Sequence, residues 1–203
     1  DLHVPYTIPS ELLSQHVGIA LLRHARRSGN MSLSQAQSEK LSEEVRRGLC
    51  SVQQSKDGSG LERIVTLVTL CIEQDGLTFT QVGKWDPARG ARPNCTLPGC
   101  KRAASELPHE ALVRLLAKEL APLEPYIDFN GTEHTVEQKD SSQYGMPTTY
   151  MRTVHFAQLR IDRSQISMPV AEQGVEGLDS QCLDEFVQRE VYTIPDGKGI
   201  GLY

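Results

Sequence analysis

TLPGCKRAASELPHEALVRLLAKELAP, residues 96 to 122, is the stretch that decides how the rest of this chain is interpreted. It opens with Leu-Pro-Gly at residues 97 to 99, a composition typical of a tight turn. Apolar side chains then recur at helical spacing, which predicts an amphipathic helix with one face in a core. That apolar stripe comprises Leu112, Val113, Leu116 and Leu120. The stretch therefore predicts a turn that leads into a core-packed helix.

The charged residues of this stretch resemble a Nudix box, the motif of a family of pyrophosphate-cleaving hydrolases. The motif has the frame of a glycine, a glutamate, an arginine and a group of helix carboxylates at fixed spacing, led in by Leu-Pro-Gly. Cys100 stands where a glycine belongs, and Ala121 replaces the closing glycine. The remaining frame is kept at Glu106, Arg114, Leu116 and Glu119.

Two further departures concern the metal-binding chemistry that the resemblance implies. In the family, three carboxylates on one helical face hold Mg²⁺, which prefers oxygen ligands in octahedral array. Leu115 and Lys118 occupy two of these three positions, and only Glu119 keeps its carboxylate. A lysine beside a single carboxylate repels a cation. We therefore lean against an enzyme and expect no catalytic residue, no metal and no cofactor.

The resemblance implies a fold and a function. The fold is an α/β/α sandwich of Nudix-like type with a mixed sheet, preceded by a helical hairpin. The function is that of a non-catalytic module that senses a nucleotide diphosphate or binds a protein within a larger protein. The alternative is a divergent Nudix hydrolase that cleaves a nucleoside diphosphate derivative with Mg²⁺, helped by acids between residues 133 and 140. The candidate ligand-binding residues are Lys101, Arg102, Glu106, Arg114, Lys118 and Glu119.

Specific roles within this candidate site also follow from the resemblance. Arg114 is expected to fold back and pair with Glu106, bracing the loop before the helix. Lys118 is expected to contact a phosphate as a point charge in place of the lost metal, with Lys101 and Arg102 at the turn.

The chain divides into a helical N-terminal segment, residues 1 to 55, and a Nudix-like α/β domain, residues 61 to 203, joined by a Ser- and Gly-rich linker. Helices are predicted for residues 9 to 27 and from Ser32 or Ser34 to about Val52. The second segment begins with a strand at residues 64 to 72, a hairpin at Asp75-Gly76 and a return strand at residues 77 to 85. Residues 86 to 94 and 133 to 140 are expected to be loops, and residues 148 to 161 a long strand.

The composition and charge of the chain limit the classes of partner that it is expected to bind. The chain has 203 residues, 38% of them hydrophobic, which is enough for a sizeable core. Its net charge of −5 argues against nucleic acid, which a basic face would have to attract. No run of residues is long and apolar enough to span a bilayer. We expect a nucleotide diphosphate ligand and a protein partner or parent chain.

The cysteines and asparagines bear on location. Among five cysteines, Cys95 and Cys100 could form a disulfide or join a zinc site with His109, although lone cysteines are usually small core residues. All three asparagines of the chain stand in glycosylation sequons, which function only in the secretory pathway. We expect a cytoplasmic protein, because Nudix-like domains are mostly intracellular, with an extracellular location as the open alternative. The sequons begin at Asn30, Asn94 and Asn130.

Overall fold

The computed structural model describes residues 9–29, 32–56, 58, 60–86, 88, 90–160, 193–195 and 200–203. Within these residues the chain divides into two compact units. Unit 1 is formed from Asp1–Val68, Cys100–Ala111 and Glu133–Val154, and unit 2 from Thr69–Gly99, Leu112–Thr132 and His155–Tyr203. Three long strands and one helix contribute residues to both units. The division into residues 1 to 55 and 61 to 203 stays a prediction.

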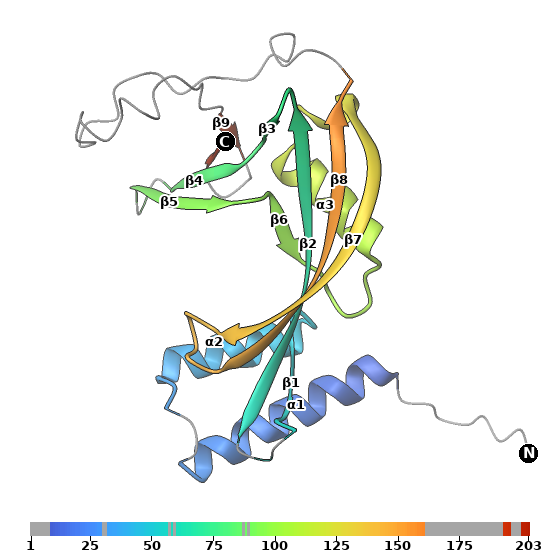
Figure 1. Ribbon diagram of the computed structural model, residues 1–203. Helices are drawn as coiled ribbons and strands as arrows, with labels where there is room; N and C mark the ends of the chain where they lie inside the picture. Colours follow the sequence, from blue (N-terminus) through green and yellow to red (C-terminus); the bar gives the residue numbers. More distant parts are fainter. Residues whose placement is uncertain are drawn as a thin grey trace, which may run out of the picture. The chain divides into compact units, whose positions relative to one another are not determined.

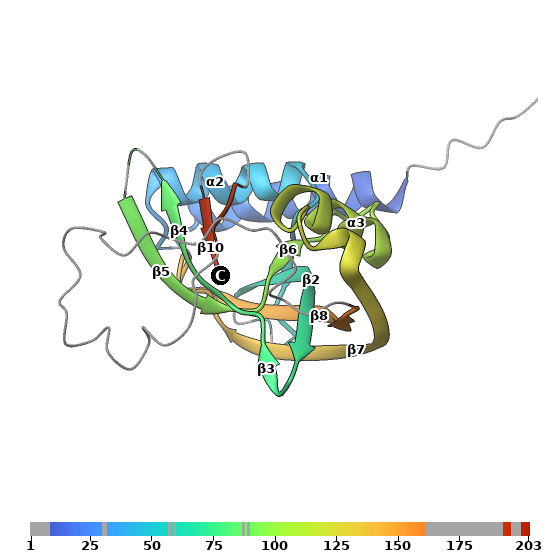
Figure 2. The same cartoon turned by 90° about the horizontal axis from the view of Figure 1, so that it is seen from above.

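Two helices open the chain, as the sequence predicts. Helix α1 spans Ser10–Arg27 and α2 spans Gln35–Arg46. Helix α2 begins with a capping box, in which the Ser34 hydroxyl accepts from the Gln37 amide at 3.2 Å and the Gln37 side chain accepts from the Ser34 amide at 3.0 Å. Figures 1 and 2 both show α1 and α2 side by side. They form the expected helical hairpin.

The predicted end of the second helix was wrong. Helix α2 stops at Arg46, and residues up to Val52 are not helical. Gly48 has a φ of 65° and its amide bonds to the Val45 carbonyl at 3.0 Å, a helix-ending arrangement that glycine adopts readily. The chain then enters strand β1, Ser51–Gln54.

The larger sheet has the strand order β1-β2-β8-β7, with β3 and β6 also paired to β2. Strand β2 spans Leu61–Gln74, β7 Ile127–Asp140 and β8 Pro147–Leu159. The short strands are β3, Leu77–Thr78, and β6, Gly99–Lys101. Strands β1 and β3 run antiparallel to β2, whereas the arrows of β2 and β8 point the same way in Figure 1. The sheet is therefore mixed, and the α/β class with a preceding helical hairpin is confirmed.

The hairpin at Asp75-Gly76 is confirmed, with φ of 52° and 74° at these residues. Its return strand is shorter than predicted, because β3 ends at Thr78 and the chain then joins a second sheet. That sheet has the order β5-β4-β10-β9, with β4 at Gln81–Asp86, β5 at Gly90–Thr96, β9 at Thr193–Pro195 and β10 at Ile200–Leu202. Figure 2 shows β10 beside β4, where Gly201 pairs with Lys84. The predicted loop at residues 86 to 94 is thus largely a strand.

Each unit has its own core. In unit 1 the buried cluster joins α1, α2, β1 and β2 with Tyr144 and Met146. Gly18 lets α1 approach closely, since a Cβ there would lie 3.2 Å from Val45 Cγ1. In unit 2, Phe79 stacks on Tyr203 with ring centroids 5.1 Å apart, and Gln81 donates to the Tyr203 hydroxyl at 2.8 Å. The buried apolar residues of unit 2 also include Leu70, Ile72, Leu112, Leu115, Leu116, Leu120 and Leu123.

Candidate functional site

Helix α3, Pro108–Glu119, carries the three positions at which the motif places metal carboxylates. Its first turn is capped by Glu110, whose carboxylate accepts from the Leu107 amide at 2.7 Å. Leu115 is only 1% exposed and forms part of the apolar side of the helix. Val113, which the sequence placed in the apolar stripe, is instead 56% exposed. The buried stripe therefore runs through Leu115, because the helix is rotated from the predicted facing.

The two charged positions of the helix differ in their surroundings. Lys118 is exposed. Glu119 is partly buried, and its carboxylate lies 3.4 Å from the Lys84 ammonium of β4. A lysine at this distance competes with a metal cation for the Glu119 carboxylate. Buried leucine, exposed lysine and a lysine-paired carboxylate do not fit a magnesium ion, whose ligands are oxygen atoms.

The turn before α3 is held by backbone and side-chain hydrogen bonds within each unit. In unit 2 the Leu70 amide donates to the Pro98 carbonyl at 2.9 Å. In unit 1 the Arg102 amide donates to the Thr66 carbonyl at 2.9 Å, and the Glu106 carboxylate accepts from the Ala103 amide at 3.1 Å. The Arg102 guanidinium also donates from Nη1 to the Glu106 carbonyl oxygen. Glu106 and Arg102 thus act together in shaping this turn.

Lys101 belongs to a buried ionic cluster in unit 1. Its ammonium lies 2.6 Å from Glu44 Oε1, and Arg63 Nη2 lies 2.6 Å from Glu44 Oε2. The Arg63 guanidinium in turn lies over the Tyr144 ring at 5.2 Å from its centroid. Burial alone would raise the pKa of Glu44, but the hydrogen bonds from Lys101 and Arg63 outweigh it and hold that pKa below its ordinary value. Burial also raises the pKa of Tyr144.

The six candidate residues are therefore distributed over both units. Lys101, Arg102 and Glu106 lie in unit 1, where Arg102 contacts Glu106 and Lys101 pairs with Glu44. The other three, Arg114, Lys118 and Glu119, lie in unit 2. Arg114 is half-buried. Its pairing with Glu106 stays a prediction.

Sequence reasoning missed the partners that decide what these side chains do. Glu44 lies 57 positions before Lys101, and Lys84 lies 35 positions before Glu119. No local pattern links residues so far apart. The one sequence signal for the buried ionic cluster was Glu44 itself. This acid directly precedes the apolar Val45 in helix α2.

The predicted loop at residues 133 to 140 is the second half of β7, so its acids do not form a cluster. Side chains alternate along a strand, which places Glu133 and Glu137 on one face and His134 and Asp140 on the other. Glu137 pairs with Lys139 at 2.8 Å, and His134 Nδ1 lies 3.2 Å from the Thr153 hydroxyl. Glu137 and His134 are therefore engaged in contacts of the sheet.

The zinc alternative also finds no support in the geometry. Among the described residues, no group of three or more His, Cys, Asp or Glu side chains could hold a metal ion. The Cys100 thiol lies 3.6 Å from the Ala111 carbonyl oxygen of the same unit.

Among the residues that the structure describes, no helix is long and apolar enough to cross a membrane. Two sequon asparagines, Asn94 on β5 and Asn130 on β7, are exposed, and Asn30 lies outside the described residues.

No protein-family model and no curated protein sequence matches this chain. Among solved structures, a NUDIX hydrolase from Nitrosomonas europaea is similar at a TM-score of 0.34 and 16% sequence identity. The match covers 68% of this chain and 92% of that one.

Proposed function

We propose that this chain is a non-catalytic Nudix-like module, in which the segment resembling a Nudix box serves as scaffold for a binding role. The observation that carries the proposal is the state of the carboxylate positions on α3. Leu115 is 1% exposed, and Glu119 is paired with Lys84 at 3.4 Å. A hydrolase of the expected type would need oxygen ligands for Mg²⁺ at these positions to neutralise phosphate charge and activate water.

Of the two binding roles, protein interaction is favoured by the contacts of the basic residues at the turn. Lys101 is held at 2.6 Å from Glu44, and Arg102 donates to the Glu106 carbonyl. A phosphate that recruited the Lys101 ammonium or the Arg102 Nη1 would have to break a contact that unit 1 uses internally. Nucleotide-diphosphate sensing is supported by Lys118, which is exposed on α3 and would bind phosphate without a metal.

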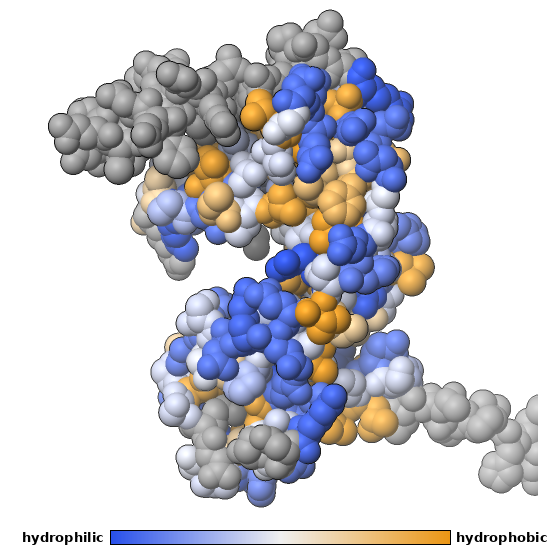
Figure 3. Space-filling view, in the orientation of Figure 1, coloured by the Kyte–Doolittle hydropathy of each residue, from blue (hydrophilic) through white to orange (hydrophobic). Residues whose placement is uncertain are grey.

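Helix α1 offers a surface for a protein partner. Leu12, Leu13 and Val17 are 47%, 54% and 48% exposed on this helix, and Figure 3 shows hydrophobic surface near its start. The last turn of α1 is basic, with His24, Arg26 and Arg27. A partner with an apolar patch flanked by carboxylates complements both features.

The two roles are separated by a binding experiment. Calorimetry and thermal-shift measurements of the whole chain with ADP-ribose and other nucleotide diphosphates would be made with Mg²⁺ and with EDTA. The interaction role predicts no stabilisation. A sensing role predicts stabilisation of about 2.7 kcal/mol at a ligand concentration of about 100 dissociation constants. Binding through Lys118 would persist in EDTA, weaken with salt and fall in Lys118→Ala but not in the exposed control Lys40→Ala.

The protein-interaction role is tested by substitutions on the exposed apolar surface of α1. A partner captured by the wild-type chain and identified by mass spectrometry should be lost with Leu13→Asp and Val17→Asp together. It should be retained with Val136→Asp, which changes a residue that is 66% exposed on β7. Equal capture by all variants would remove α1 from the proposal.

A further inference from the structure

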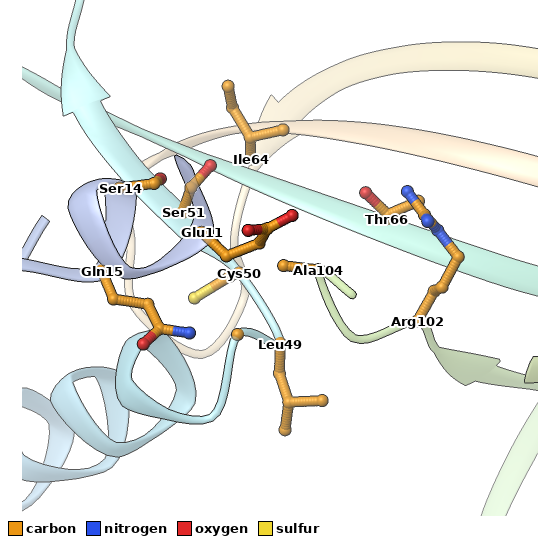
Figure 4. Close-up of a pocket in the computed structure, with 11 residues that line it drawn as sticks. Glu11, Ser14, Gln15, Leu49, Cys50, Ser51, Ile64, Thr66, Arg102 and Ala104 are labelled. Carbon is orange, nitrogen blue, oxygen red and sulfur yellow. The ribbon is translucent and has the colours of Figure 1, made fainter. Parts of the chain in front are cut away.

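A small cavity in unit 1 is lined by α1, the segment after α2, β2 and the turn after β6 (Figure 4). Its volume is about 80 Å³. One water takes up about 10–15 Å³ of such a cavity, so there is room for roughly five to eight non-hydrogen atoms. This is far below the ~300 Å³ at which pockets for nucleotide-sized ligands begin. The cavity therefore suits a very small molecule.

The lining carries one charge of each sign. Glu11 comes from the first turn of α1, and Arg102 from the turn after β6. Figure 4 shows the Arg102 guanidinium beside Thr66 and the Glu11 carboxylate extending toward the same strand, β2. The hydroxyls of Ser14, Ser51 and Thr66 also line the space.

Two hydrogen bonds fix the position of Arg102, and one buried hydrogen-bond donor of its side chain has no acceptor among the described residues. Its amide is fixed to the Thr66 carbonyl at 2.9 Å, and its Nη1 donates to the Glu106 carbonyl. Its Nε is buried, and no described residue accepts a hydrogen bond from it. Buried donors are nearly always satisfied in folded proteins, and a water or a bound ligand would supply the acceptor that the described residues do not.

We propose that this cavity binds a small zwitterion of the amino-acid class, with its carboxylate at Arg102 and its ammonium at Glu11. A guanidinium edge is well matched to a carboxylate, and a carboxylate to an ammonium, through charge-assisted hydrogen bonds. A simple anion would leave Glu11 facing a like charge, and a simple cation would do the same to Arg102. Glycine, alanine and serine have the size that the cavity allows. None of the residues that line this cavity is a carboxylate position of α3, so failure of the proposed zwitterion site would leave the proposed function standing.

The test is calorimetric titration of the whole chain with glycine, alanine and serine at millimolar concentrations. Acetate and methylamine serve as the half-ligands, and tryptophan serves as an amino acid too large for the cavity. Saturable binding of a small amino acid, at least about tenfold tighter than either half-ligand, is the expected result, because each charged contact contributes more than one factor of ten. Absence of binding overturns the proposal, as does acetate or tryptophan binding equally well.

Two variants locate the site. Arg102→Gln and Glu11→Gln should each weaken binding about tenfold or more. Arg92→Gln on β5 and Glu39→Gln on α2, both at exposed positions, are matched controls that should leave it unchanged. Should Arg102→Gln fail to fold by circular dichroism, Glu11→Gln carries the test alone. Unchanged affinity in Glu11→Gln would contradict the proposed ammonium site.

Discussion

The ammonium of Lys101 lies 2.6 Å from the carboxylate of Glu44, joining the segment that resembles a Nudix box to helix α2 within one compact unit. The same carboxylate receives Arg63, whose side chain is only 4% exposed. A residue that the sequence offered as a phosphate ligand is therefore one of two cations neutralising a buried acid. The helical hairpin and the turn before α3 share this ionic cluster.

Glu44→Gln is expected to destabilise the fold by about 3–5 kcal/mol near neutral pH, because it leaves the Arg63 charge buried without its counter-ion. The control is Glu43→Gln, since Glu43 pairs with Arg46 at 3.3 Å on an exposed face and should contribute about 0–1 kcal/mol. Urea unfolding of both variants measures the difference. Equal losses would show that the cluster does not stabilise unit 1.

The same carboxylate predicts a pH dependence. The pKa of Glu44 is lower in the folded chain than its ordinary value of 4.5. Its contribution to stability is therefore fully present above pH 4.5 and is lost as the pH falls below 4.5 through the folded-state pKa. Wild-type stability should drop more steeply than that of Glu44→Gln in this range. Parallel curves in acid unfolding experiments would contradict the assignment.

Leu115 is expected to act as a core residue and not as a vacant ligand position. Leu115→Ala should cost about 2–5 kcal/mol, and Leu115→Glu should cost more because it buries a carboxylate. Val113→Glu, on the same helix but 56% exposed, is the matched control and should have little effect. Thermal unfolding compares them. A tolerated Leu115→Glu that also binds Mg²⁺ would place this position in a metal cleft.

The predicted pairing of Arg114 with Glu106 implies that Arg114→Ala costs about 1–3 kcal/mol, because the substitution would leave a carboxylate unpaired. Lys118→Ala, four residues further along and exposed, should change stability by less than about 0.5 kcal/mol. Denaturant titrations of the two variants decide the matter. A neutral Arg114→Ala would remove the bracing role.

The elements that neighbouring residues mark in the sequence were predicted correctly. Asp75-Gly76 predicted its hairpin, and the apolar run at residues 64 to 72 predicted the centre of β2. The prediction of a loop at residues 133 to 140 was wrong. Strand β7 is exposed along nearly its whole length, so its sequence lacks the apolar alternation that marks a strand. The predicted end of α2 was wrong because Gly48, a helix-ending residue, was included in the helical pattern.

The candidate site was less predictable than the fold. Spacing alone identified Leu115, Lys118 and Glu119 as three positions of one motif, but exposure separates them. Leu115 is buried because its neighbours on the helix, Leu112 and Leu116, face the same core. The pairing of Glu119 with Lys84 depends on how a strand lies beside the helix, which helical periodicity does not contain.

The proposed lack of catalysis is tested most directly by a hydrolysis assay of the purified chain with ADP-ribose, NADH and nucleoside triphosphates in the presence of Mg²⁺ or Mn²⁺. Glu119→Gln, prepared in parallel, reports any contaminating enzyme. A non-catalytic module should give the same background rate for both proteins with every substrate. Turnover by the wild-type chain with a kcat on the order of 1 s⁻¹ or more, lost in Glu119→Gln, would contradict it and establish a hydrolase.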